Sequence, residues 1–131
     1  MKVVHVSGKR KQAIARATLR LGNGIVRINS KLLQFWEPSF YRTKIEEPLI
    51  IAGEAAKHFD IDVNVKGGGI NSQAEAARQA VAKALSVVDK SLQQAFLSYD
   101  RALLVSDIRK KEERKPNRHG KARAKVQKSY R

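Results

Sequence analysis

The uneven distribution of positive charge limits what this chain can fold into. The sequence has 131 residues, with 27 Lys or Arg against 12 Asp or Glu and a formal net charge of +15. Residues 109–131 alone hold 11 basic and 2 acidic residues. A block of like charge this dense repels itself and has few apolar side chains, so it cannot form a core of its own. We therefore expect a folded domain over residues 1–108 and an extended basic tail over residues 109–131.

Alternating apolar and polar residues predict several strands in the first part of the chain. The clearest alternation covers residues 13–21 and residues 59–66, and it is typical of strands with one buried face. Two shorter β-branched segments, 3–6 and 25–28, also indicate strands. Gly22-Asn23-Gly24 separates segments 13–21 and 25–28, which predicts that these two form a β-hairpin.

Helical patterns follow the last predicted strand. Ser72 with Glu75 three residues later has the spacing of a capping box, and apolar residues then recur at helical spacing, which predicts a helix over 72–88. A second helix is predicted over 91–99, and one or two short helices over 43–58. Strands combined with helices in this order predict an α+β fold, with a mixed sheet, a β-hairpin and packed helices.

Four aromatic residues lie close together in the sequence. Phe35, Trp36, Phe40 and Tyr41 stand near basic residues, and such rings can stack on unpaired bases. They also supply the largest apolar area per residue for a small core. We favour packing, because the chain has few other large side chains.

Three consecutive glycines, Gly67, Gly68 and Gly69, join the strand over 59–66 to the helix over 72–88. Residues without Cβ allow close approach of another backbone, and a helix start attracts phosphate. The triplet is therefore either a phosphate contact or a tight connection, and the sequence does not distinguish the two. The lysine of a nucleotide-binding loop is absent, because Ile70-Asn71-Ser72 follows the triplet.

The sequence contains no arrangement typical of an enzyme or a metal protein. Cysteine is absent, and His5, His58 and His119 have no acidic partner at metal-ligand spacing. Asp60 and Asp62 alternate on one strand, as solvated surface residues do. Apolar runs reach only four residues and no signal-peptide pattern opens the chain. We expect a cytoplasmic protein without catalytic activity, metal or cofactor.

The basic residues instead indicate a polyanionic partner. Lys9-Arg10-Lys11 forms one cluster, and the tail forms the other. Extended at ~3.3 Å per residue, 23 residues span about 75 Å, which is much longer than the domain itself. A tail of this length and charge is typical of a segment that threads among the phosphates of RNA or DNA.

Several segments resemble one known family along the whole chain. They are Gly8–Ala17, Gly24–Asn29, Glu47–Leu49, Val63–Ala74 and the ending Lys121–Arg131. In order and spacing they are similar to ribosomal protein nine of the small subunit, a universal family. Tyr130-Arg131 resembles its archaeal and eukaryotic branch, since many bacterial relatives carry Lys at the penultimate position.

The resemblance implies an α+β domain like the second domain of ribosomal protein five, placed on the head of the small subunit beside neighbouring head proteins. It implies contacts to the 3′ domain of the small-subunit rRNA and to the anticodon stem-loop of peptidyl-site tRNA. The implied rRNA contacts are Lys9, Arg10, Lys11, Arg16, Gly67, Gly68, Gly69, Arg114, Lys115, Arg118, Lys121, Arg123 and Lys125. The implied tRNA contacts are Lys128, Ser129, Tyr130 and Arg131.

Two points stay open at this level. Tyr130 could stack on a base or ribose, or pack against the tail. The residues also allow two other classes of protein, a small-molecule kinase that shares the fold, and a cationic protein that coats nucleic acid without specificity.

Overall fold

The structure is a computed structural model that describes residues 3–36, 39–117 and 122. Its strands are β1 Val4–Arg10, β2 Ala13–Leu21, β3 Val26–Ile28, β4 Lys31–Leu32 and β5 Phe59–Lys66. Its α-helices are α1 Ser39–Ala52, α2 Ile70–Val88 and α3 Ser91–Tyr99, and its 3-10 helices are η1 Leu33–Phe35, η2 Gly53–His58 and η3 Arg101–Leu103. The predicted α+β fold with a mixed sheet is confirmed.

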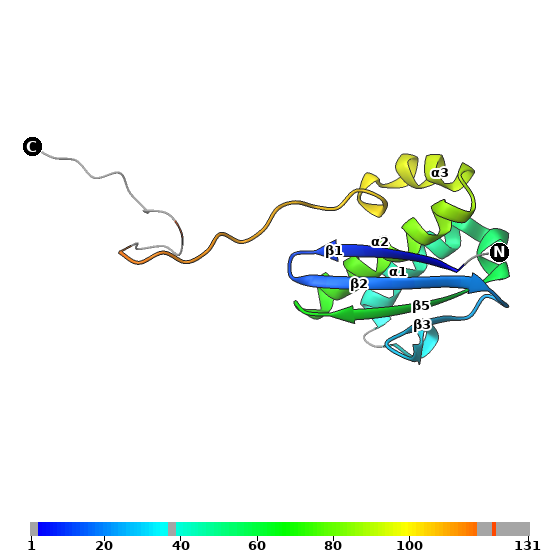
Figure 1. The fold of residues 1–131 in the computed structure, drawn as a ribbon, viewed down its shortest axis with the longest axis horizontal. Helices are drawn as coiled ribbons and strands as arrows, with labels where there is room; N and C mark the ends of the chain where they lie inside the picture. The colour runs from blue at the N-terminus through cyan, green and yellow to red at the C-terminus, as the bar shows by residue number, and fades with distance from the viewer. Residues whose placement is uncertain (1–2, 37–38, 118–121, 123–131) are drawn as a thin grey trace, which may run out of the picture.

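The sheet has the strand order β1-β2-β5-β3-β4 (Figure 1). β1 and β2 form an antiparallel hairpin, β2 and β5 are antiparallel, and β3 lies parallel to β5. The hairpin predicted over residues 13–28 is therefore wrong, because β5 lies between β2 and β3. The Gly22–Gly24 turn closes instead around Asp60 of β5, whose Oδ1 accepts the backbone N–H groups of Asn23 and Ile25 at 2.9 and 3.0 Å.

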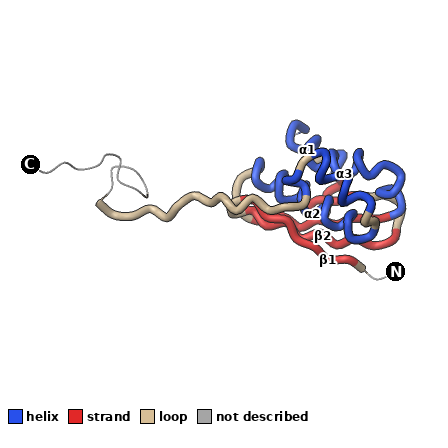
Figure 2. Tube along the Cα trace, turned by 90° about the horizontal axis from the view of Figure 1, so that it is seen from above, coloured by secondary structure: helices blue, strands red, loops and turns tan. Residues whose placement is uncertain are grey.

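All three α-helices cover one face of the sheet and leave the other face open (Figure 2). The predicted helix over 91–99 is confirmed, and the predicted helix over 72–88 begins two residues earlier, at Ile70. The predicted capping box is wrong: the N-cap is Gly69, and Ser72 is buried inside the first turn. The strand-to-helix connection is tighter than the capping pattern suggested.

Small residues let α2 lie directly on the sheet. Ala13, Ala15 and Ala17 of β2 are at most 1% exposed, and the buried face of α2 is mostly alanine. Gly8 of β1 meets the helix most closely, because a Cβ there would lie 2.2 Å from the backbone oxygen of Ala76. Close packing of this kind fixes the position of β1, and with it the lysines at the end of β1, relative to α2.

The aromatic group divides between core and surface. Trp36 is 9% exposed and Tyr41 is half-buried against the core, as the packing interpretation predicts. Phe35 and Phe40 are 59% and 70% exposed. Packing therefore accounts for Trp36 and Tyr41 and not for the other two.

The chain leaves the domain after η3. Residues 106–115 form neither helix nor strand, and they run away from the end of the sheet where the β1–β2 turn lies (Figures 1 and 2). Among the described residues, no helix has both the length and the apolar character needed to cross a membrane.

Candidate nucleic-acid interface

Four lysines line one cavity at the end of the sheet where the tail leaves. The cavity has a volume of about 710 Å³ and lies between the β1–β2 turn, the start of α2 and the tail. Its lining residues are Lys9, Lys11, Gln12, Ile14, Gly68, Gly69, Ser72, Lys110 and Lys111. We call it the lysine cavity. Its ammonium groups come from segments about 100 residues apart in the sequence, so only the fold brings them together.

Two of these lysines lie against each other. The side chain of Lys110 contacts that of Lys9, and this contact, with the positive charge of Lys110, lowers the pKa of Lys9. Two ammonium groups in contact repel each other, and an anion placed between them would relieve the repulsion. The geometry of the cavity therefore favours a negatively charged ligand.

Two members of the glycine triplet, Gly68 and Gly69, line this cavity, and the three glycines differ in their surroundings. Gly67 and Gly68 have φ angles of +81° and +65°, and a Cβ on Gly67 would lie 2.5 Å from the backbone oxygen of Gln12. These two glycines permit the tight connection against the β1–β2 turn. A Cβ on Gly69 would meet nothing within 4 Å. Gly69 is thus the member of the triplet that leaves room for a ligand.

The start of α2 contributes to the charge of the cavity. Gly69 is the N-cap of this helix, and no side chain in the described part of the chain caps it. The first N–H groups of a helix carry a partial positive charge that favours anions. This charge has the same sign as the lysines, so both act in the same direction.

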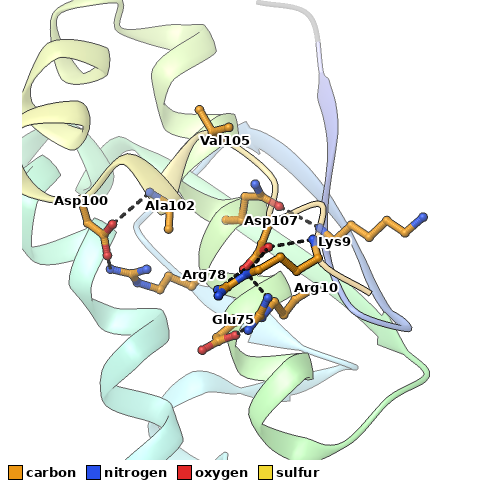
Figure 3. A pocket seen from close by; sticks show the side chains of 10 residues that line it. Lys9, Arg10, Glu75, Arg78, Asp100, Ala102, Val105 and Asp107 are labelled. Atoms are coloured by element: carbon orange, nitrogen blue, oxygen red, sulfur yellow. Dashed lines mark hydrogen bonds and ion pairs between the residues drawn. The ribbon is translucent and has the colours of Figure 1, made fainter. Parts of the chain in front are cut away.

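Arg10 is engaged inside the protein (Figure 3). Its Nε donates to Glu75 Oε2 at 2.7 Å, and its Nη1 forms an ion pair with Asp107. The side chain of Arg10 is 21% exposed. Arg10 therefore differs from Lys9 and Lys11, whose side chains line the cavity.

Arg16 lies on the open face of the sheet. It is exposed and sits between Ser7 of β1 and Asn64 of β5 in the strand register. The acidic residues of β5 lie further along the same face. Asp62 is 3.4 Å from Arg20 and 3.7 Å from Arg27, so arginines offset its charge. The open face is thus basic at the end nearest the lysine cavity.

The tail accounts for the remaining predicted contacts. Arg114 and Lys115 are exposed in the described part of the tail. Eight predicted contacts lie outside the described residues: Arg118, Lys121, Arg123, Lys125, Lys128, Ser129, Tyr130 and Arg131. Lys110 and Lys111 also line the cavity, although they were not among the predicted contacts. Their position next to the predicted domain boundary was the signal available, since the start of a tail must lie against the domain.

The positions of the His, Asp and Glu side chains are relevant to metal binding and catalysis. Within ranges 3–36 and 39–117, no group of three or more His, Asp or Glu side chains is placed to hold a metal ion. His5 Nδ1 lies 3.2 Å from Thr18 Oγ1, and Asp60 caps a turn as described above. These groups have structural partners in the fold.

Fold and cavity together define a class: a small basic α+β protein whose described residues include a cavity lined by four lysines. Comparison with known proteins identifies its family. Residues 8–131 match the family described as ribosomal protein S9/S16. The chain is 53% identical over 134 residues to small ribosomal subunit protein uS9 of Methanococcus maripaludis, strain C7, and 51% identical over 133 residues to that of Methanothrix thermoacetophila. Both alignments cover 100% of this chain and of the relative.

The chain belongs to this ribosomal protein family. It is a structural protein of the small ribosomal subunit, located with that subunit in the cytoplasm, and it is not an enzyme. The resemblance predicted from the sequence is confirmed, including its archaeal character. The kinase interpretation and the interpretation as a general coating protein are both replaced by the family assignment.

Proposed function

We propose that this chain binds small-subunit rRNA in the head of the subunit, with the lysine cavity as a main contact to the phosphate backbone. The observation that carries the proposal is the convergence of Lys9, Lys11, Lys110 and Lys111 on one cavity. A backbone phosphate is small and negatively charged, and its two non-bridging oxygens accept hydrogen bonds. It can therefore lie between ammonium groups that repel each other in its absence. Gly69 leaves space for the sugar-phosphate backbone to approach.

The second part of the proposal concerns the basic tail. Residues 1–108 form the rRNA-binding domain, and residues 109–131 continue along rRNA through Arg114, Lys115 and the basic residues that follow. Support comes from the charge of this segment, 11 basic against 2 acidic residues. Ordering a charged segment costs conformational entropy, and contact with many phosphates compensates for that cost.

The third part of the proposal is a contact to peptidyl-site tRNA by Lys128, Ser129, Tyr130 and Arg131. Support comes from the family and from the position of these residues at the end of a long basic segment.

The rRNA proposal is tested with the full chain and a fragment of the 3′ domain of small-subunit rRNA. Replacing Lys110 by Gln removes one phosphate contact, so the slope of log affinity against log salt should become less negative by about 0.7–0.9. Lys90→Gln is the matched control, because Lys90 is exposed between α2 and α3 and lies outside the cavity. Equal slopes for the two variants would contradict the proposed site.

The tRNA proposal is tested on small subunits assembled with a chain that lacks Ser129–Arg131. Assembly and retention of the protein through a high-salt wash should match those of the full chain. Affinity of the subunits for tRNA in the peptidyl site, measured at fixed salt, should fall. Unchanged tRNA affinity would remove the tRNA contact and leave the rRNA proposal standing.

A further inference from the structure

The root of the tail, residues 106–109, begins at Ser106, which is hydrogen-bonded to the buried side chain of Gln79. This side chain is 4% exposed, although Gln is a polar residue. Its Nε2 donates to Ser106 Oγ at 3.1 Å, and its Oε1 accepts the backbone N–H of Lys9 at 2.8 Å. One amide therefore joins the edge of β1, the middle of α2 and the start of the tail.

A second link runs through Asp107. Its carboxylate forms an ion pair with Arg10 of β1 (Figure 3). It also accepts a hydrogen bond from Arg109 Nη2 at 2.7 Å. Hydrogen bonds from Arg109, together with the charges of Arg10 and Arg109, hold the pKa of Asp107 well below its ordinary value. Asp107 is thus ionised at neutral pH, and both arginine links are charged.

These links decide where the next residues of the tail lie. Lys110 follows Asp107 by three residues, a reach of about 10 Å along an extended chain. With Ser106 and Asp107 fixed next to β1, Lys110 lies against Lys9 in the lysine cavity. A root free to swing would separate the lysines of the tail from those of the β1–β2 turn.

We propose that Gln79 and Arg10 form a clamp on Ser106 and Asp107 that fixes the direction in which the tail leaves the domain. In this role Arg10 and Gln79 are positioning residues that assemble the lysine cavity, and neither is a contact to nucleic acid. The consequence for RNA binding rests on the proposed function. The clamp itself is a property of the free protein and can be measured without RNA.

The discriminating variant is Ser106→Ala combined with Asp107→Asn. It removes the tail side of the clamp and leaves the core unchanged, and it raises the net charge of the chain by one. A purely electrostatic view predicts tighter binding to RNA from this added charge. Glu113→Gln is the matched control, since it adds the same charge in the exposed tail without touching the clamp.

The first readout is ¹⁵N relaxation of residues 106–110 in the free chain. We expect these residues to be as rigid as the domain in the parent and in the control, and mobile on the nanosecond timescale in the double variant. The conservative Asp107→Glu variant keeps the carboxylate and should stay rigid. A root that is equally ordered in the parent and the double variant would overturn the clamp.

The second readout is affinity for the 3′-domain rRNA fragment at fixed salt. Loss of preorganisation should weaken binding of the double variant by about threefold to tenfold relative to Glu113→Gln, against the electrostatic trend. Affinity equal to or tighter than that of the control would overturn the positioning role. If the parent chain itself does not bind the fragment, the proposed function fails, and the relaxation measurement still decides the clamp.

Discussion

Gly67 and Gly69 are two residues apart, and an added methyl group should have opposite consequences at the two positions. At Gly67 the backbone has φ +81°, where an L-residue costs about 1–2 kcal/mol. The Cβ would also lie 2.5 Å from the backbone oxygen of Gln12, and overpacking of this kind costs about 1–3 kcal/mol. In the opposite direction, replacing Gly by Ala lowers the conformational entropy of the unfolded chain, which stabilises the folded protein by about 0.4–1 kcal/mol.

Gly67→Ala should therefore lower the free energy of unfolding by about 1–5 kcal/mol, where a whole domain typically has about 5–15 kcal/mol. For a domain near 100 residues this corresponds to a fall in Tm of about 5–25 °C. Thermal unfolding followed by circular dichroism measures it directly. A Tm within about 2 °C of the parent would refute the packing explanation for this glycine.

Gly69→Ala should leave the fold intact. Its φ of −98° and ψ of 176° are ordinary for alanine, and its Cβ would meet no atom within 4 Å. Alanine is a weaker N-cap than glycine, which costs about 0.5–1 kcal/mol of stability. The lower conformational entropy of the unfolded chain with alanine offsets about the same amount. If the rRNA backbone enters the lysine cavity here, the methyl group should weaken binding threefold or more at unchanged Tm. Parent-like affinity would exclude Gly69 as an rRNA contact.

Three further predictions follow from single residues. Phe96 is fully buried between the helices, so Phe96→Ala should lower the free energy of unfolding by about 3–5 kcal/mol in urea titrations. Lys110 lowers the pKa of Lys9, and a bound phosphate should raise it again. RNA binding at alkaline pH should therefore be accompanied by uptake of a proton. Calorimetry should show this uptake as a binding enthalpy that varies with the ionisation enthalpy of the buffer, and the variation should be absent in Lys110→Gln. Equal binding enthalpies for the parent in all buffers would contradict the prediction. Hydrogen bonds from the N–H groups of Ile25 and Asn23 lower the pKa of Asp60, so its stabilisation is present above about pH 4 and is lost as pH falls through the lowered value. Asp60→Asn should show a shallower loss of stability in acid than the parent does.

Much of the fold could be predicted because the relevant signals are local. Alternation over residues 13–21 and 59–66 predicted β2 and β5, and helical spacing predicted α3 and most of α2. These patterns depend on neighbours a few residues apart. The capping box failed for the same reason: Ser72 and Glu75 had the correct spacing, but Glu75 pairs with Arg10 and Lys44 across the fold.

The candidate site was predicted in part. The sequence indicated Lys9, Lys11 and the glycine triplet. The structure brings the two lysines, Gly68 and Gly69 to one cavity, which Gly67 does not line. The sequence could not show that Arg10, between the two lysines, turns inward to acidic partners. Strand alternation places Arg10 on the opposite face from its neighbours, but which face is covered depends on the position of α2.

The amino-acid sequence alone determined the α+β class of the fold and predicted a separate basic tail over residues 109–131, because charge density and hydrophobic pattern are properties of consecutive residues. Only the tertiary structure decided that β5 lies between β2 and β3, that Gly67 packs on Gln12, and that Lys110 lies against Lys9. Each of these joins segments from about 35 to 100 residues apart in the sequence. Such contacts form only when packing of the whole domain compensates for the entropy of closing the intervening chain.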